Sequence, residues 1–276
     1  MPMDTASRAL KAALEAARKA GVVALKGFRG GSASPRGGRD PRSGIKVEYK
    51  SDSSPVTAWD RASEEIIRRT LARQFPGDGF IGEEYGEIGG NTGASWVIDP
   101  IDGTKNFIRG IPFWGSLIAR VVGGKLALGV MHLPALGETL WATRGGGAFR
   151  NGKPLRVSRV RDLRHSTILY GGLKYFMKRG QKADMAELRP LALIAARSAS
   201  TRCFGDCWAY TFVARGLAEA MLEKDVKPWD IAATSVIIRE AGGRCTDWKG
   251  REDWRADSIL ATNGLVHAPL LKLLRR

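Results

Sequence analysis

The stretch WVIDPIDGTKNFIRG, residues 96–110, runs from an apolar segment into two aspartates three positions apart. Its apolar start predicts a buried strand, and Asp99 and Asp102 come where that strand ends. Gly103 allows a ligand close to the backbone, and Thr104 is placed to begin a short helix whose exposed N–H groups favour phosphate. The stretch therefore indicates either a ligand site or a plain turn in which Asp and Thr side chains cap the next helix.

A further acid follows another short apolar segment. Residues 80–82 predict a strand, and Glu83 comes directly after it. Because sites gather at strand ends in layered α/β proteins, we expect Glu83 near Asp99 and Asp102. Clustered carboxylates repel one another, and a divalent cation relieves that repulsion. The candidate ligands are carboxylate oxygens, and the Ile101 carbonyl is free to join them. Because no histidine lies near them in sequence, Mg²⁺ is favoured over zinc.

The second half of the chain offers one more acid in a suggestive place. Asp230 stands at the start of a predicted helix, directly after Pro228 and Trp229. Taken alone, an aspartate at this position is an N-cap. The three histidines lie outside every motif and are predicted to be structural or surface residues: His132, His165 and His267.

The chain is strongly basic, with 44 Lys and Arg against 28 Asp and Glu and a formal charge of +16. This balance indicates anionic partners, either nucleic acid or phosphorylated metabolites. The densest basic stretch, residues 27–50, is rich in Gly, Ser, Pro and Arg and predicts a solvated loop, with nucleic-acid contact as the alternative. Because no nucleic-acid motif or aromatic-basic platform accompanies it, a small phosphorylated metabolite is the favoured partner.

Hydropathy and cysteine content indicate the cellular compartment in which the protein is expected. No stretch of about 18 apolar residues occurs, and the amphipathic N-terminal helix lacks the apolar core of a secretory signal, so no membrane association is expected. Three cysteines do not make a disulfide framework and favour a reducing, cytoplasmic location. Cys203 and Cys207, four apart, are predicted to be small buried side chains, with a zinc site as the alternative.

The chain divides into two parts of different pattern. We predict an α+β part over residues 1–155, which carries most of the candidate ligands, and an α/β part over residues 156–276, which carries Asp230. In the first part, the capping-box pair Thr57 and Asp60 begins a helix. The expected elements there are helices over about 1–28 and 57–75 and strands over 80–82, 95–99, 115–122, 125–132, 138–143 and 155–158. The second part is expected to hold strands over 166–171, 201–205, 217–223 and 258–261 and helices over 183–197, 206–215 and 229–241.

Three motifs carry a resemblance to a known family. GEE at 82–84, DPIDGTKNF at 99–107 and WDIAA…EAGG at 229–243 resemble the signatures of the inositol monophosphatase family of Mg²⁺-dependent, lithium-sensitive phosphatases, in the family's order. The resemblance covers about residues 5–270. It implies the layered α/β/α/β/α sugar-phosphatase fold, with mixed and antiparallel sheets sandwiched by helices and the site at the junction of the two parts. It also implies a homodimer.

The resemblance assigns roles to matching positions. It implies that two or three Mg²⁺ ions are held by Glu83, Asp99, the Ile101 carbonyl, Asp102 and Asp230. Thr104, supported by Asp60, would help Glu83 and a metal activate the attacking water. Gly103 and Thr104 would bind the phosphate, and Asp102 and Asp230 would also contact substrate. Lys50 would lie near the metal site, with a surface lysine as the equal alternative.

A fourth segment is expected to contact the leaving group of the substrate. GDCWAY at 205–210 resembles the histidinol-phosphatase branch, in which Asp206, with Glu223 beside it, would pair with the cationic leaving group of L-histidinol phosphate. An N-cap is the alternative for Asp206. The expected function is hydrolysis of L-histidinol phosphate in histidine biosynthesis. The alternatives are an inositol-1-monophosphatase or broad sugar-phosphate phosphatase and, in another class, a basic nucleic-acid-binding protein with a vestigial site.

Overall fold

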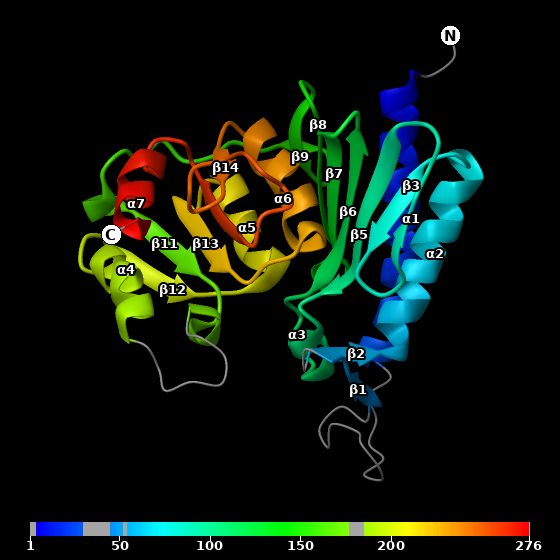
Figure 1. Cartoon of the computed structure of the whole chain (residues 1–276), viewed down its shortest axis with the longest axis horizontal. Helices are drawn as coiled ribbons and strands as arrows, with labels where there is room; N and C mark the ends of the chain where they lie inside the picture. The colour runs from blue at the N-terminus through cyan, green and yellow to red at the C-terminus, as the bar shows by residue number, and fades with distance from the viewer. Residues whose placement is uncertain (1–3, 30–44, 52–53, 177–184, 276) are drawn as a thin grey trace.

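The computed structural model describes residues 4–29, 45–51, 54–176 and 185–275. In Figure 1 the eight-stranded and the five-stranded sheet lie between layers of helices, which is the layered arrangement that the resemblance implies. Most of the predicted basic loop over residues 27–50 lies outside the described residues. None of the helices in the described part of the chain combines the length and apolar character that a membrane span requires.

The larger sheet has eight strands in the order β10-β9-β8-β7-β6-β5-β3-β4. Its strands are β3 (Gly79–Gly82), β4 (Gly86–Ile88), β5 (Ala94–Asp102), β6 (Gly115–Val122), β7 (Lys125–Leu133), β8 (Glu138–Thr143), β9 (Gly147–Arg150) and β10 (Lys153–Pro154). Only β3 and β5 pair in parallel in this sheet. Because parallel strands end at the same edge, the acids that follow β3 and β5 come to lie together.

Two helices cover the outer face of this sheet: α1 (Thr5–Arg29) and α2 (Ala58–Gln74). Buried alanines recur on α1 at helical spacing, including Ala9, Ala13, Ala16 and Ala20, and they pack in one core with Ile67 of α2 and residues of the sheet. Small side chains allow close packing of the helix, because no long side chain holds the backbones apart. The predicted N-terminal amphipathic helix is thereby confirmed.

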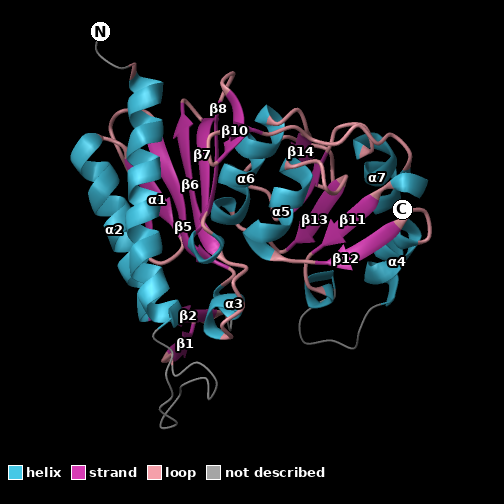
Figure 2. Ribbon diagram, turned by 180° about the vertical axis from the view of Figure 1, so that it is seen from behind, coloured by secondary structure: helices cyan, strands magenta, loops and turns pink. Residues whose placement is uncertain are grey.

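A central helical layer separates the two sheets, as Figure 2 shows from behind. It consists of α5 (Asp206–Ala214) and α6 (Pro228–Glu240). The second sheet has the order β12-β11-β13-β15-β14, with strands β11 (Thr167–Tyr170), β12 (Ser200–Cys203), β13 (Ala220–Lys224), β14 (Arg244–Thr246) and β15 (Ser258–Thr262). Its far face is covered by α4 (Met185–Ala195) and α7 (His267–Leu274). The layered α/β/α/β/α fold with mixed and antiparallel sheets is confirmed.

Three short elements lie below the larger sheet in Figure 1: β1 (Val47–Tyr49), β2 (Pro55–Thr57) and α3 (Thr104–Ile108). Single 3₁₀ turns occur at Pro134–Leu136, Leu163–His165 and Leu173–Phe176. The last of these turns and α3 both border the pocket described below. They are therefore part of its mouth.

Some local predictions are wrong. Residues 155–158 form no strand, because the chain leaves the larger sheet after Pro154 and crosses to α6, where the Val157 N–H donates to Ala241 O. Cys203 is exposed rather than buried, since it ends β12 at the sheet's edge, whereas Cys207 is buried. The first sheet ends at Pro154 and the second begins at Thr167. The division into parts 1–155 and 156–276 stays a prediction.

Candidate active site

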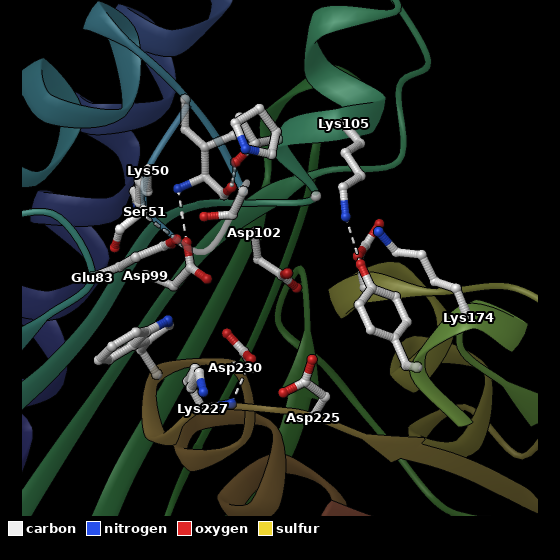
Figure 3. Close-up of a pocket in the computed structure, with 18 residues that line it drawn as sticks. Lys50, Ser51, Glu83, Asp99, Asp102, Lys105, Lys174, Asp225, Lys227 and Asp230 are labelled. Carbon is white, nitrogen blue, oxygen red and sulfur yellow. Dashed lines mark hydrogen bonds and ion pairs between the residues drawn. The ribbon is translucent and has the colours of Figure 1, made fainter. Parts of the chain in front are cut away.

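A pocket of about 770 Å³ opens where β5 ends, beside α3 and the N-termini of α5 and α6. Its charged lining consists of the acids Glu83, Asp99, Asp102, Asp206, Asp225 and Asp230 and the lysines Lys50, Lys105, Lys174 and Lys227. In Figure 3 the carboxylates of Asp99, Asp102 and Asp230 are directed toward one another. The two halves of the chain thus meet at one acidic centre.

The centre of the pocket is a carboxylate cluster. One oxygen from each of Asp99, Asp102 and Asp230 lies within 4.8 Å of the others. Burial, followed by the charge of Glu83, raises the pKa of Asp99 well above its usual range, and burial followed by Asp206 does the same for Asp102. Carboxylates packed in this way cannot all ionise unless a cation joins them. An all-oxygen donor set of this kind fits a hard divalent metal ion.

An irregularity in β5 explains how both aspartates of the motif reach this cluster. In a regular strand, residues three positions apart point to opposite faces. The pairing of β5 with β6 shifts register between Asp99 and Asp102, and Asp99 Oδ1 accepts a hydrogen bond of 3.0 Å from the Ile101 N–H. The Pro100 carbonyl accepts the hydroxyl of Ser116 at 2.7 Å, which fixes the bend. A bulge of this type redirects side chains, so both carboxylates face the pocket.

Asp230 combines a capping and a ligand geometry. The N-cap of α6 is Lys227, so the alternative of Asp230 as the N-cap does not hold. From the third helical position, Asp230 Oδ2 accepts the Lys227 N–H at 2.7 Å. Burial raises the pKa of Asp230 to about 7 despite this hydrogen bond. The cap therefore fixes the carboxylate at the edge of the cluster.

Glu83 lies in the same pocket, but it is paired with a lysine. Lys50 Nζ contacts Glu83 Oε1 at 2.8 Å and Glu84 Oε1 at 2.7 Å. Burial lowers the pKa of Lys50, yet the two carboxylates outweigh burial and hold that pKa above its usual range. Of the two alternatives for Lys50, the position near the metal-ligand candidates is the one observed.

The GEE motif owes its shape to a residue that the sequence did not reveal. Glu64 of α2 is fully buried, and its Oε2 accepts the Glu84 N–H at 2.7 Å. Its Oε1 accepts Arg68 Nε at 2.7 Å. A Cβ on Gly82 would lie 1.9 Å from Glu64 Oε1. Glycine therefore allows the strand to approach Glu64, which in turn orients the chain at Glu83.

Thr104 and Asp60 meet as predicted. The capping box of α2 holds Asp60 Oδ2 with the N–H and hydroxyl of Thr57, at 2.8 and 2.6 Å. Asp60 Oδ1 lies 3.2 Å from Thr104 Oγ1, which also lies 3.0 Å from the Ile101 carbonyl. Burial raises the pKa of Asp60 to about 6. Gly103, the N-cap of α3, takes a left-handed backbone with φ of 87°, which places the first turn of α3 beside the cluster.

A smaller recess of about 100 Å³ adjoins the cluster on the side of α5. Asp206 and Glu223 both line it, as predicted. Asp206 is the first residue of α5 rather than its N-cap, which is Gly205. The Glu223 carboxylate accepts the hydroxyl of Tyr210 at 2.5 Å, and burial raises the pKa of Glu223 to about 8. Two half-buried acids therefore line the space where a leaving group would extend.

The sequence did not point to the residues on the rim of this recess. Lys105 Nζ donates to Tyr175 Oη at 2.5 Å, which joins α3 to the 3₁₀ turn of the second half (Figure 3). Lys174 also lies over the Tyr175 ring, 5.0 Å from its centroid. Lys105 lies within the DPIDGTKNF motif and could have been singled out. Tyr175 lies in no motif.

A partly buried carboxylate cluster at strand ends, beside a helix N-terminus and a Thr-Asp pair, is an arrangement that suits the metal-dependent hydrolysis of phosphate esters. The sequence matches the inositol monophosphatase family over residues 6–276, and the chain belongs to that family. It is a phosphoric monoester hydrolase, of a metal-dependent family that acts on small phosphorylated substrates.

Similar proteins carry more than one name. The chain is 40% identical to a histidinol-phosphatase of Chlorobaculum parvum, over 94% of this chain and 91% of that protein. It is also 40% identical to a histidinol-phosphatase of Mycobacterium tuberculosis, over 82% and 87% of the two chains. Among solved structures, the suppressor protein SuhB of Bartonella henselae has a TM-score of 0.85 at 31% identity, covering 97% and 98%. An inositol monophosphatase of Thermotoga maritima has a TM-score of 0.81 at 30% identity, covering 96% of each chain.

Proposed function

We propose that this protein hydrolyses L-histidinol phosphate to L-histidinol and phosphate, as a step of histidine biosynthesis. The observation that carries the substrate is the pair of half-buried acids, Asp206 and Glu223, that line the recess beside the carboxylate cluster. Histidinol carries an ammonium and a titratable imidazole, and a carboxylate forms charge-assisted hydrogen bonds with such groups. Inositol is a neutral polyol, whose hydroxyls can donate hydrogen bonds to these carboxylates but carry no opposite charge to pair with them. The identity to two histidinol-phosphatases supports the same substrate.

The metal we propose is Mg²⁺, two or three ions per site. The residues that would hold it are Glu83, Asp99, Asp102, Asp230 and the carbonyl of Ile101, all of which line the pocket. When bound, the ions stabilise charge on the phosphoryl oxygens and lower the pKa of a bound water. Carboxylate and carbonyl oxygens suit Mg²⁺, and no histidine or cysteine belongs to the metal-ligand cluster found among the described residues.

The chain's own groups orient the reaction. The Thr104 hydroxyl lies within donor distance of both Asp60 Oδ1 and the Ile101 carbonyl, and when it donates to Asp60 its lone pairs can accept a proton of the attacking water. With a pKa of about 6, Asp60 is suited to accept a proton near neutral pH, and Glu83 offers a second acceptor on the same water. Gly103 and Thr104, at the start of α3, bind the phosphate. Asp102 and Asp230 contact the ester oxygen side of the substrate.

Two other functions are alternatives to this one. Hydrolysis of inositol 1-phosphate or of sugar phosphates generally is supported by the likeness to the inositol monophosphatase of Thermotoga maritima. Nucleic-acid binding with a vestigial site is disfavoured, because every predicted ligand lines the pocket. A homodimer and a cytoplasmic location stay predictions.

Genetic complementation tests the proposal. Expression of the chain in a bacterium that lacks its histidinol-phosphatase should restore growth without histidine. The Asp102→Asn variant, expressed at the same level, should not. Failure of the wild-type chain to restore growth, while the purified protein hydrolyses inositol 1-phosphate rapidly, would point to the inositol phosphatase instead.

A further inference from the structure

Asn106 of α3 joins the first half of the site directly to a carboxylate of the recess. Asn106 Nδ2 donates to Asp206 Oδ2 at 2.9 Å and to the Phe113 carbonyl at 2.9 Å. Both partners are pure acceptors, so the amide nitrogen must face them, and both of its N–H groups are used. Asn106 and Asp206 are 100 residues apart in sequence. The asparagine therefore ties the first half of the chain to the recess in the second.

Asp206 needs such a tie because its position is strained and crowded. Its φ of 61° lies in the left-handed region, which costs free energy for a residue with a Cβ. A Cβ on Gly103 would lie 3.3 Å from Asp206 Oδ2, so the carboxylate lies directly against the backbone of the phosphate-binding turn. Burial raises the pKa of Asp206, and the charge of Lys105 opposes that shift. The Asp206 carboxylate therefore keeps one orientation only if a neighbouring donor, such as the Asn106 amide, holds it there.

We propose that Asn106 is a positioning residue for substrate selectivity: by holding Asp206 Oδ2, it turns Oδ1 toward the cationic group of the leaving alcohol. This inference rests on the proposed function, since it concerns how that function's substrate is selected. Among the described residues, no hydrogen bond to Asp206 Oδ1 is found, so that oxygen remains for the ligand. The amide donor also favours the ionised form of Asp206, which a cation requires.

The geometry separates this role from catalysis. Asn106 donates to Asp206 and to a backbone carbonyl, and it does not belong to the carboxylate cluster. Its loss should therefore weaken the binding of cationic esters and leave the phosphoryl chemistry intact. A purely structural asparagine would instead affect every ester alike. The two roles are distinguished by measuring KM and kcat separately on a cationic and a neutral ester.

The test compares L-histidinol phosphate with inositol 1-phosphate at saturating Mg²⁺. In Asn106→Leu, KM for L-histidinol phosphate should rise roughly tenfold, the equivalent of about 1.4 kcal/mol, with kcat and both constants for inositol 1-phosphate within about twofold. In an Asp206→Ala background, adding Asn106→Leu should not change the selectivity further, because the residue acts through Asp206. Should Asn106→Leu fail to fold, Asn106→Ala, which removes both donors without adding bulk, should give the same change in selectivity.

Asn263 provides the matched control. It also donates twice through Nδ2, to Ser158 Oγ at 3.0 Å and the Val160 carbonyl at 2.8 Å, but it does not line the pocket. Asn263→Leu should lower Tm without changing the ratio between the substrates. If wild-type protein does not prefer L-histidinol phosphate, the proposed function fails and this inference with it. If wild type prefers it and Asn106→Leu keeps the same ratio, only the inference is overturned.

Discussion

Thr104 Oγ1 lies 3.2 Å from Asp60 Oδ1, and the helix cap of α2 holds that carboxylate in place. The capping box occupies Asp60 Oδ2 with two donors from Thr57, so the remaining oxygen has one orientation. The capping box that stabilises the start of α2 therefore also orients the Asp60 oxygen that faces Thr104. This arrangement makes the contributions of Asp60 to stability and to turnover separable by mutation.

Replacement of Asp60 by Asn should reduce turnover much more than stability. An Asn oxygen can still accept from Thr57, but its NH₂ group would face Thr104 and reverse the polarity of that hydrogen bond. We expect kcat to fall by roughly 10²- to 10⁴-fold, the usual contribution of general acid–base catalysis, with KM little changed. Steady-state kinetics and thermal unfolding of the same preparation measure both effects.

Thr57→Ala is the matched control for that variant. It removes the cap hydroxyl, which costs about 1 kcal/mol, and leaves the Asp60 charge in place. Its turnover should fall far less than that of Asp60→Asn. Equal losses of kcat in the two variants would mean that Asp60 acts only as a cap.

Metal binding should stabilise the fold through the buried carboxylates. Repulsion among Asp99, Asp102 and Asp230 is relieved when a cation joins them. At Mg²⁺ about 100 times its Kd, linkage adds about 2.7 kcal/mol, so Tm should rise by roughly 5 °C over the EDTA-treated protein. Differential scanning calorimetry with and without Mg²⁺ measures this gain.

Asp102→Asn should abolish the gain in Tm while raising the Tm of the metal-free protein. The variant removes a buried charge, and an Asn oxygen can still accept the Cys207 N–H that Asp102 accepts. Isothermal titration should show Mg²⁺ affinity reduced in parallel. A variant that keeps the full Mg²⁺-dependent rise in Tm would remove Asp102 from the metal site.

Gly82→Ala should be destabilising although alanine is a small residue. The added Cβ would lie 1.9 Å from Glu64 Oε1, and that side chain is fully buried and holds both Arg68 and the Glu84 N–H. We expect a loss of about 1–3 kcal/mol, as for other overpacked sites, measured by urea denaturation. Gly89→Ala, at a glycine where a Cβ would meet nothing within 4 Å, should change stability by less than about 0.5 kcal/mol.

Acid should destabilise the protein partly through His267. Burial lowers the pKa of this side chain to about 4, while an unfolded histidine has a pKa of about 6.5. The unfolded state therefore binds more protons between these values, and stability falls as pH falls through that window. Between pH 7 and 5 the loss should be on the order of 1–2 kcal/mol, and His267→Gln should reduce it. His132, whose pKa burial also lowers to about 4, supplies a further part.

The layered fold was predicted from the resemblance of three motifs to a known family, whereas local signals predicted the individual helices and strands. The paired strands over residues 115–122 and 125–132 and the Thr57–Asp60 capping box each depend on signals within a few residues, and each is present in the structure. The strand over residues 155–158 was predicted from apolar composition alone. There, Val157 donates to Ala241 at the end of α6 instead of to a strand, which only the tertiary fold decides.

The site was predictable where its residues share a motif and not elsewhere. Asp99, Asp102 and Thr104 lie in one stretch, and the bulge that brings the two acids together is itself local. Glu64 and Tyr175 reach the site through packing between distant elements, and neither carries a sequence signal of its own. For Asp206, the cap was the wrong alternative, because the chain places Gly205 at the N-cap.

The selectivity of the purified enzyme tests the central proposal most directly. We predict that kcat/KM for L-histidinol phosphate exceeds that for inositol 1-phosphate by at least about tenfold with Mg²⁺ present, and that Asp206→Ala removes most of this preference by weakening only the cationic substrate. Equal or better hydrolysis of inositol 1-phosphate, with Asp206→Ala affecting both esters alike, would contradict histidinol phosphate as the substrate.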